Sequence, residues 1–235
     1  MKQALRLLLT IAPYVVLAFF ALLMLRITLP YLALRDDVAF LRIKHGVIDN
    51  GVWKAAFYVH VFTSMFALVA GFTQFSRGVL RRYRSLHRWM GRLYVGVILL
   101  LSGPAGFVMA LYANGGWLSQ LAFTLLSLAW LYTTAQAYRQ ALRRDWAAHR
   151  AWMVRSYALT LSALTLRAWK LLIVWVFRPH PMDVYLLVAW LGWLPNLVLA
   201  EAWLRGQWYK HRTRQRSLAV VSDPRQQVGR QAGSM

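Results

Sequence analysis

Residues 87–112 read HRWMGRLYVGVILLLSGPAGFVMALY, a histidine and an arginine followed at once by an apolar run. Residues 149–177 read HRAWMVRSYALTLSALTLRAWKLLIVWVF and open in the same way, with one extra residue before the Trp-Met pair. A helix needs roughly 20 apolar residues to cross a membrane, and both runs reach that length. The two stretches therefore predict two membrane helices that each carry a histidine at the same end.

Four further apolar runs extend this pattern along the chain. The sequence is 59% hydrophobic and only 15% charged, which is too apolar for a soluble domain of 235 residues. It predicts an all-α integral membrane protein, with one six-helix bundle over residues 1–204 and a basic tail over 205–235 that is expected to be disordered. The six runs lie at about 8–29, 53–76, 89–112, 117–138, 151–177 and 183–204.

The basic residues are distributed unevenly between the connections. Six Lys or Arg lie in 77–92, four in 139–150 and seven in 205–235, against five in the three connections of the other side together. This bias follows the positive-inside rule and predicts that both termini lie in the cytoplasm. The net charge of +21 is thereby assigned to topology and to contact with anionic lipids. Nucleic-acid binding is not expected, because the chain has no soluble domain with interleaved basic and aromatic residues.

The repeated His-Arg opening predicts an internal repeat. Spans two and three, and spans four and five, are interpreted as two copies of one hairpin that run in the same direction and form a four-helix core. In such a parallel repeat His87 and His149 are symmetry mates at the same depth.

His87 and His149 are the leading candidates for metal ligands. Two imidazoles at one depth on separate helices match the ligand set of a b-type haem, with Met153 as an alternative axial ligand. Gly91, one turn after His87, leaves space for a porphyrin. The haem propionates are expected to pair with the neighbouring arginines, which are Arg88, Arg92, Arg150 and Arg155. The alternative is that these basic helix starts bind only lipid phosphate.

A second group of cations is predicted in the outer half of the membrane. It comprises His60, about 10 Å below the outer end of its span, together with Arg167 and Arg26. Ionisable groups inside a membrane are costly and are usually functional. The group is therefore expected to handle a proton or to hold an anionic ligand or a quinone carbonyl. The alternatives are a packing role for His60 and snorkelling of the arginines to the outer headgroups.

Several activities are excluded by the residues that the chain lacks. Without cysteine there is no disulfide, thiolate metal site or iron–sulfur cluster. The chain has no phosphate-binding loop, no dinucleotide fingerprint and no nucleophile elbow. Seven acidic residues offer little for catalysis by paired carboxylates.

Three motifs together resemble a known family. They are His60 with Gln74-Phe75, the helix start at His87-Arg88, and the stretch from His149 to Thr160 with Arg167. Over about residues 55–200 they resemble an uncharacterised family of bacterial membrane proteins, the domain of unknown function 2306. In pattern they are also similar to transmembrane b-type cytochromes of the ascorbate-reducible kind, which hold two haems between paired histidines. That resemblance implies one haem b between His87 and His149, since His60 has no partner histidine on the fourth span.

Three hypotheses follow for the function. The first is an inner-membrane electron-transfer protein of the oxidoreductase type that binds one b-type haem and meets a quinone or another redox partner at the outer group. The second is a haem-free binding or transport protein for an anionic lipid or small metabolite. The third is an assembly partner of a larger respiratory complex.

Overall fold

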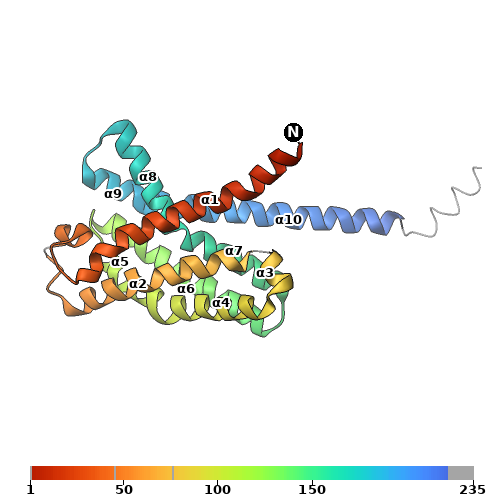
Figure 1. Cartoon of the computed structure of the whole chain (residues 1–235), viewed down its shortest axis with the longest axis horizontal. Helices are drawn as coiled ribbons and strands as arrows, with labels where there is room; N and C mark the ends of the chain where they lie inside the picture. Colours follow the sequence, from red (N-terminus) through yellow and green to blue (C-terminus); the bar gives the residue numbers. More distant parts are fainter. Residues whose placement is uncertain (1, 45, 76, 222–235) are drawn as a thin grey trace, which may run out of the picture. The chain divides into compact units, whose positions relative to one another are not determined.

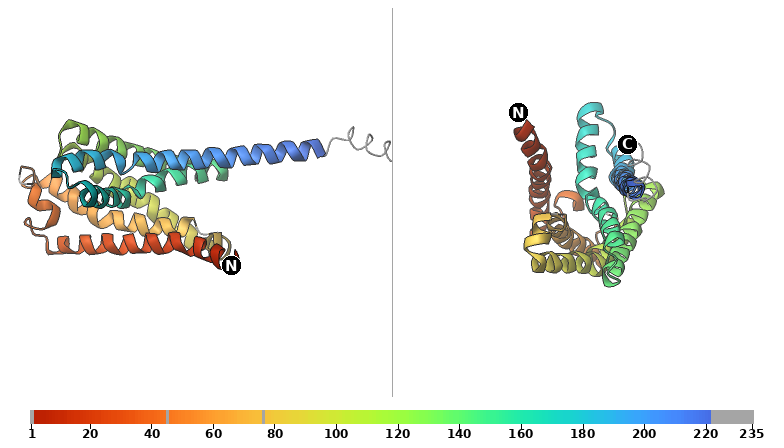
Figure 2. Two further views of the ribbon diagram at one scale, coloured as in Figure 1. Left: turned by 90° about the horizontal axis from the view of Figure 1, so that it is seen from above. Right: turned by 90° about the vertical axis from the view of Figure 1, so that its right-hand side faces the viewer.

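The computed structural model describes residues 2–44, 46–75 and 77–221, and every element of regular secondary structure in these ranges is a helix. This confirms the all-α prediction. The membrane core consists of α2, α4–α5, α6 and α7–α8, with α1 alongside α2 (Figures 1 and 2). The helices are α1 (Lys2–Thr28), α2 (Gly51–Gln74), α3 (Arg77–Arg82), α4 (Arg84–Gly96), α5 (Gly103–Leu111), α6 (Trp117–Leu142), α7 (Trp146–Thr160), α8 (Ser162–Phe177), α9 (Pro181–Leu191) and α10 (Leu194–Val221). Shorter segments are η1 (Leu29–Ala33), η2 (Ala39–Ile43) and the π-helical η3 (Val97–Ser102).

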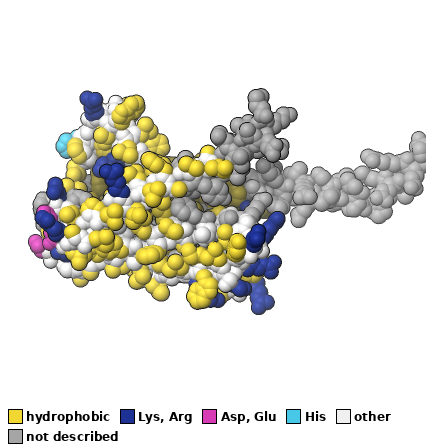
Figure 3. All heavy atoms as spheres, viewed as in Figure 1, with side chains coloured by type: hydrophobic (Ala, Val, Ile, Leu, Met, Phe, Trp, Pro, Cys, Tyr) yellow, Lys and Arg dark blue, Asp and Glu magenta, His cyan; other side chains and the backbone are white. Residues whose placement is uncertain are grey.

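Five of the six predicted spans are long and apolar enough to cross a membrane. The first predicted run lies in α1, which contributes a shorter apolar segment, Ala18–Ala33, so the sixth span stays a prediction. In the space-filling view apolar side chains cover most of the visible face, and Lys and Arg gather at the end that carries α3 (Figure 3). The spans are Gly51–Gly71, Arg84–Leu111, Trp117–Leu142, Trp146–Phe177 and Pro181–Trp208.

A second unit begins at Val198, and the structure describes it as the continuation of α10 as far as Val221. The described part of the predicted tail is therefore helical. Residues 222–235, for which disorder was expected, lie outside the described residues.

Close packing between α2 and α7 holds the core together. The ring of Tyr157 lies against Gly71, where an added Cβ atom would come within 2.0 Å of the ring. Tyr157 also packs against Phe75, at 5.1 Å between ring centroids, and against Tyr94, at 6.4 Å. Gly71 is therefore required for this approach, because any larger residue would displace the tyrosine.

Three spans are irregular near their middles. The span of α4 and α5 contains the π-helical η3, the span of α7 and α8 breaks at Leu161, and α9 ends shortly before α10 begins. Asn196 links the last two breaks, because its amide donates to the carbonyl of Ala158 at 3.1 Å and to the hydroxyl of Thr165 at 2.9 Å. Thr165 in turn donates to the carbonyl of Gly192. Polar groups freed by the irregular backbone are thus bonded inside the protein, as the membrane interior requires.

The loop between α1 and α2 closes the end of the core opposite α3. Lys44 is buried in it, donates to the carbonyl of Tyr112, and lies 5.5 Å from the ring centroid of Phe40 and 5.6 Å from that of Trp53. Burial lowers the pKa of Lys44 to about 8, because the charged amine is removed from water. This lysine fastens the loop to the end of α5.

Candidate functional site

His87 and His149 lie on two helices that are linked by hydrogen bonds between side chains. The hydroxyl groups of Tyr94 on α4 and Ser156 on α7 are 2.8 Å apart. His87 precedes Tyr94 by seven residues, and His149 precedes Ser156 by seven, without a break in either helix. Seven residues make about two turns and about 10.5 Å, so both histidines lie at the same depth and on the same helix faces as the bonded pair. The two side chains are close enough for their charges to interact.

The two imidazoles have different hydrogen-bond environments. Nδ1 of His149 donates to the carbonyl of Ala137 at 2.8 Å, which orients the ring and leaves the lone pair on Nε2. Nδ1 of His87 is buried and has no hydrogen-bond partner. A buried polar atom without a partner is costly and calls for an explanation such as a ligand that the structure does not include.

The side chain of Gln74 on α2 occupies the space beside Gly91. An added Cβ atom at Gly91 would lie 3.1 Å from Oε1 of Gln74, and Nε2 of Gln74 donates to the carbonyl of His87 at 3.2 Å. The structure therefore places Gly91 against this amide. Its predicted role beside a porphyrin stays a prediction.

The predicted arginines line the rim of the histidine layer. Arg88, Arg92 and Arg150 are exposed, while Arg155 is half-buried. The guanidinium of Arg92 lies 5.5 Å from the ring centroid of Trp89, and that of Arg155 lies 4.7 Å from that of Trp152. These aromatic contacts hold cations at the inner end of the core, where an anionic group would meet them.

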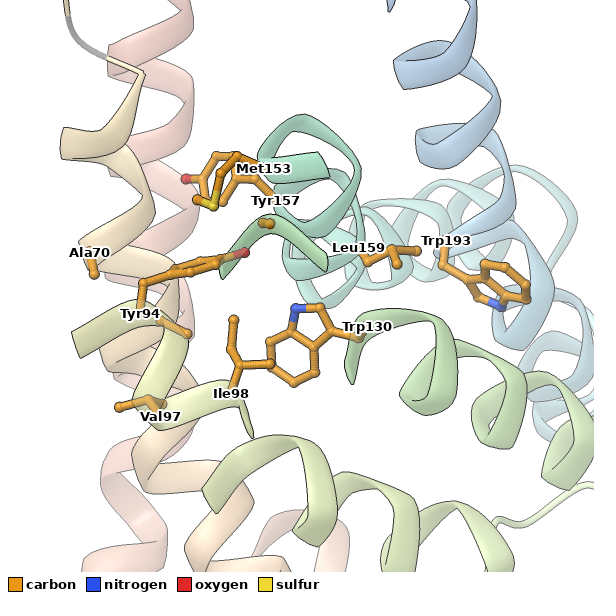
Figure 4. Packing of buried hydrophobic residues seen from close by; sticks show 11 residues of the cluster. Ala70, Tyr94, Val97, Ile98, Trp130, Met153, Tyr157, Leu159 and Trp193 are labelled. Atoms are coloured by element: carbon orange, nitrogen blue, oxygen red, sulfur yellow. The ribbon is translucent and has the colours of Figure 1, made fainter. Parts of the chain in front are cut away.

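A buried hydroxyl network lies two turns outward of the histidines, and sequence reasoning missed it. The hydroxyl of Tyr94 also pairs with that of Thr160 at 2.8 Å, and Thr134 pairs with Ser156 at 2.7 Å. Nε1 of Trp130 donates to Thr160 at 2.9 Å. Figure 4 shows Tyr94 and Trp130 reaching in from opposite sides, with Met153 and Tyr157 above them. Ser and Thr residues scattered over two apolar helices form no recognisable sequence motif. They can be identified as a network only because the structure turns these faces of α6 and α7 toward α4.

Of the predicted outer group, the structure brings together His60 and Arg167. Nδ1 of His60 donates to the carbonyl of Ser102, at the end of the π-helical segment, at 2.8 Å. An added Cβ atom at Gly106 would come within 2.9 Å of that nitrogen, so this glycine is needed for the approach. The charge of Arg167 is close enough to interact with His60, whereas Arg26 is exposed on α1.

The described chain contains no cluster of three or more His, Asp or Glu side chains that could hold a metal ion. Haem ligation by His87 and His149 therefore stays a prediction.

Comparison with known proteins identifies the chain's family. The family described as predicted membrane protein (DUF2306) matches residues 57–204, and the chain belongs to it. That segment contains His60, His87, His149 and Arg167. No curated protein and no solved structure matches the chain.

Proposed function

We propose that this member of the DUF2306 family binds one b-type haem between His87 and His149 and takes part in electron transfer in the bacterial inner membrane, with both termini in the cytoplasm. The observation that carries the proposal is the register of the two histidines. His87 lies seven residues before Tyr94 and His149 seven residues before Ser156, and the hydroxyls of Tyr94 and Ser156 are hydrogen-bonded. Bis-histidine ligation requires this arrangement, with two imidazoles facing each other at one depth.

The surrounding residues fit the cofactor. The bond to Ala137 holds His149 with a lone pair on Nε2, which is the form that ligates iron. His87 is the proposed second ligand, and its buried Nδ1 has no hydrogen-bond partner within the protein. Met153, one turn from His149, is buried, and Met90, one turn from His87, packs against the same apolar cluster. Flexible, polarisable methionine side chains adapt readily to a bulky apolar ring.

The remaining residues have supporting roles in this proposal. When bound, the haem supplies reversible one-electron chemistry. Arg88, Arg92, Arg150 and Arg155 provide cations for its propionates. The hydroxyl network of Tyr94 fixes α4 against α7, so that the distance between the histidines is held by bonds two turns away.

An optical spectrum of the detergent-purified protein, expressed with adequate haem supply, tests the proposal. A sharp Soret band with resolved α and β bands after reduction is expected for a six-coordinate haem. His87→Ala and His149→Ala should lose these bands. His180→Asn is the matched control, since His180 is exposed at the start of α9 and Asn retains its helix-capping role. A colourless wild type, or bands unchanged in both alanine variants, contradicts haem ligation by this pair.

A second candidate is a haem-free protein that binds anionic lipid at the inner rim. It is favoured by the exposed Arg92, which is held against Trp89 at the inner end of the core. A colourless protein that retains a phospholipid in native mass spectrometry would support this function, and Arg92→Gln should then weaken the retention.

A further inference from the structure

Arg167, a half-buried cation in the predicted outer half of the membrane, has no acidic partner among the described residues. None of the helices α1 to α8 contains an Asp or Glu, and the acidic residues before α9 lie in the connections between helices. Two ion pairs of the described chain, Arg35–Asp37 and Lys54–Asp36, involve residues at the end of the core that is predicted to face outward. Arg167 belongs to neither. Because an uncompensated charge in the membrane interior is costly, its guanidinium calls for an anion from outside the chain.

The guanidinium of Arg167 points away from the outer headgroups. Its Nη1 donates to the carbonyl of Ala163, one turn back toward the middle of the membrane, at 2.7 Å. An arginine that snorkels would direct its charge toward the nearer surface. The predicted alternative of snorkelling therefore does not fit Arg167, although the exposed Arg26 remains free to snorkel.

Polar side chains from three helices lie within one or two turns outward of one apolar cluster. A buried cluster of Met24, Leu68 and Leu164 joins α1, α2 and α8. Arg167 lies one turn outward of this cluster on α8, and the buried Thr28 lies one turn outward on α1. On α2, Ser64 and then His60 follow in the same direction. The apolar cluster thus closes the inner side of a polar layer.

His60 offers a second polar contact in this layer. Its Nδ1 donates to the carbonyl of Ser102, so the ring proton is on Nδ1. The lone pair on Nε2 then accepts a hydrogen bond from a hydroxyl or a bound water. Trp130 packs edge-on at 6.4 Å between ring centroids and keeps the imidazole in place.

We propose that Arg167 and His60 bind the oxyanion head, a carboxylate or a phosphate, of an amphiphilic molecule that enters from the outer leaflet. The guanidinium pairs with two oxygens of the head, and His60 accepts from a hydroxyl or water beside it. The apolar body of the ligand remains among lipid-facing side chains. This proposal does not depend on haem binding.

Native mass spectrometry with added amphiphiles tests the proposal. Dioleoylphosphatidylglycerol, oleate and uncharged dioleoylglycerol are titrated against wild type, Arg167→Gln and His60→Gln. Arg26→Gln is the matched control, because it removes an exposed cation from the same half of the membrane. Wild type and the Arg26 variant are expected to bind one charged amphiphile at least about tenfold more tightly than Arg167→Gln, and His60→Gln should show a smaller loss.

The pattern of binding identifies the source of the ligand. Preference for phosphatidylglycerol indicates a lipid phosphate, and preference for oleate indicates a free carboxylate. Equal binding by wild type and Arg167→Gln, or no preference for either charged amphiphile over dioleoylglycerol, overturns the proposal. If Arg167→Gln does not fold, Arg167→Lys replaces it: the loss of the two-pronged contact should weaken binding severalfold, and unchanged affinity contradicts the site.

Discussion

Replacing Gly71 by alanine should destabilise the core. The added Cβ would lie 2.0 Å from Cε2 and 2.5 Å from Cδ2 of Tyr157, so the ring must move. Phe75 and Tyr94 pack around that ring and limit its escape. Overpacking of this kind costs about 1–3 kcal/mol, and the better helix propensity of alanine returns up to about 1 kcal/mol. The net expectation is a loss of about 1–2 kcal/mol.

Thermal unfolding in detergent, followed by tryptophan fluorescence, measures this loss. For a chain of this size it corresponds to a decrease in Tm of about 2–8 °C. Gly96→Ala is the matched control, because nothing lies within 4 Å of its added Cβ and the residue is also helical. That variant should melt at or slightly above the wild-type temperature. If Gly71→Ala melts as high as Gly96→Ala, the close contact between α2 and α7 is refuted.

Three further predictions address other parts of the molecule. Folded Lys44 has a pKa of about 8, below its ordinary 10.5, so folding releases its proton between these values and stability should rise with pH there. The Tm of wild type should rise relative to the Tm of Lys44→Met from pH 8 to 10.5. A constant difference in Tm would contradict the burial of the amine. Thr160→Val should cost about 1–3 kcal/mol in the same melting assay, because it leaves the buried Nε1 of Trp130 without an acceptor, while Tyr94 keeps its bond to Ser156. A neutral effect would refute the hydroxyl network. In this cysteine-free chain an impermeant thiol reagent on intact cells should label Trp117→Cys and not Trp146→Cys, two exposed positions at opposite ends of α6–α7, and the reverse pattern would overturn the orientation.

The membrane spans were predictable because each depends on local sequence. Five apolar runs coincide with spans of the structure to within a few residues. The repeated His-Arg start indicated that His87 and His149 share one depth, and the register of Tyr94 with Ser156 agrees with it. Length and position along a helix are properties of one segment, so they can be read without knowing its neighbours.

The irregular middles of the spans were harder to foresee. Pro104 and Pro195 mark two of them, because proline cannot donate to the preceding turn. The break at Leu161 has no such sequence signal. The carbonyl of Ala158 beside it accepts a hydrogen bond from Asn196, which lies 35 residues beyond Leu161 in the chain. The hydroxyl network likewise depends on how three helices are rotated about their axes, which is a property of the assembled bundle. The sequence predicted which cations lie in the outer group. Only the structure distinguishes Arg167, which points toward the middle of the membrane, from the exposed Arg26.

The ratio of haem to protein in wild type, His87→Ala and His149→Ala tests the central claim most directly. Pyridine haemochrome absorbance gives the haem concentration, and amino-acid analysis gives the protein concentration. We expect one haem per wild-type chain and its loss in both variants, with the His180→Asn control unchanged. A wild-type protein without haem, or an equal haem content in either alanine variant, would contradict haem ligation by His87 and His149.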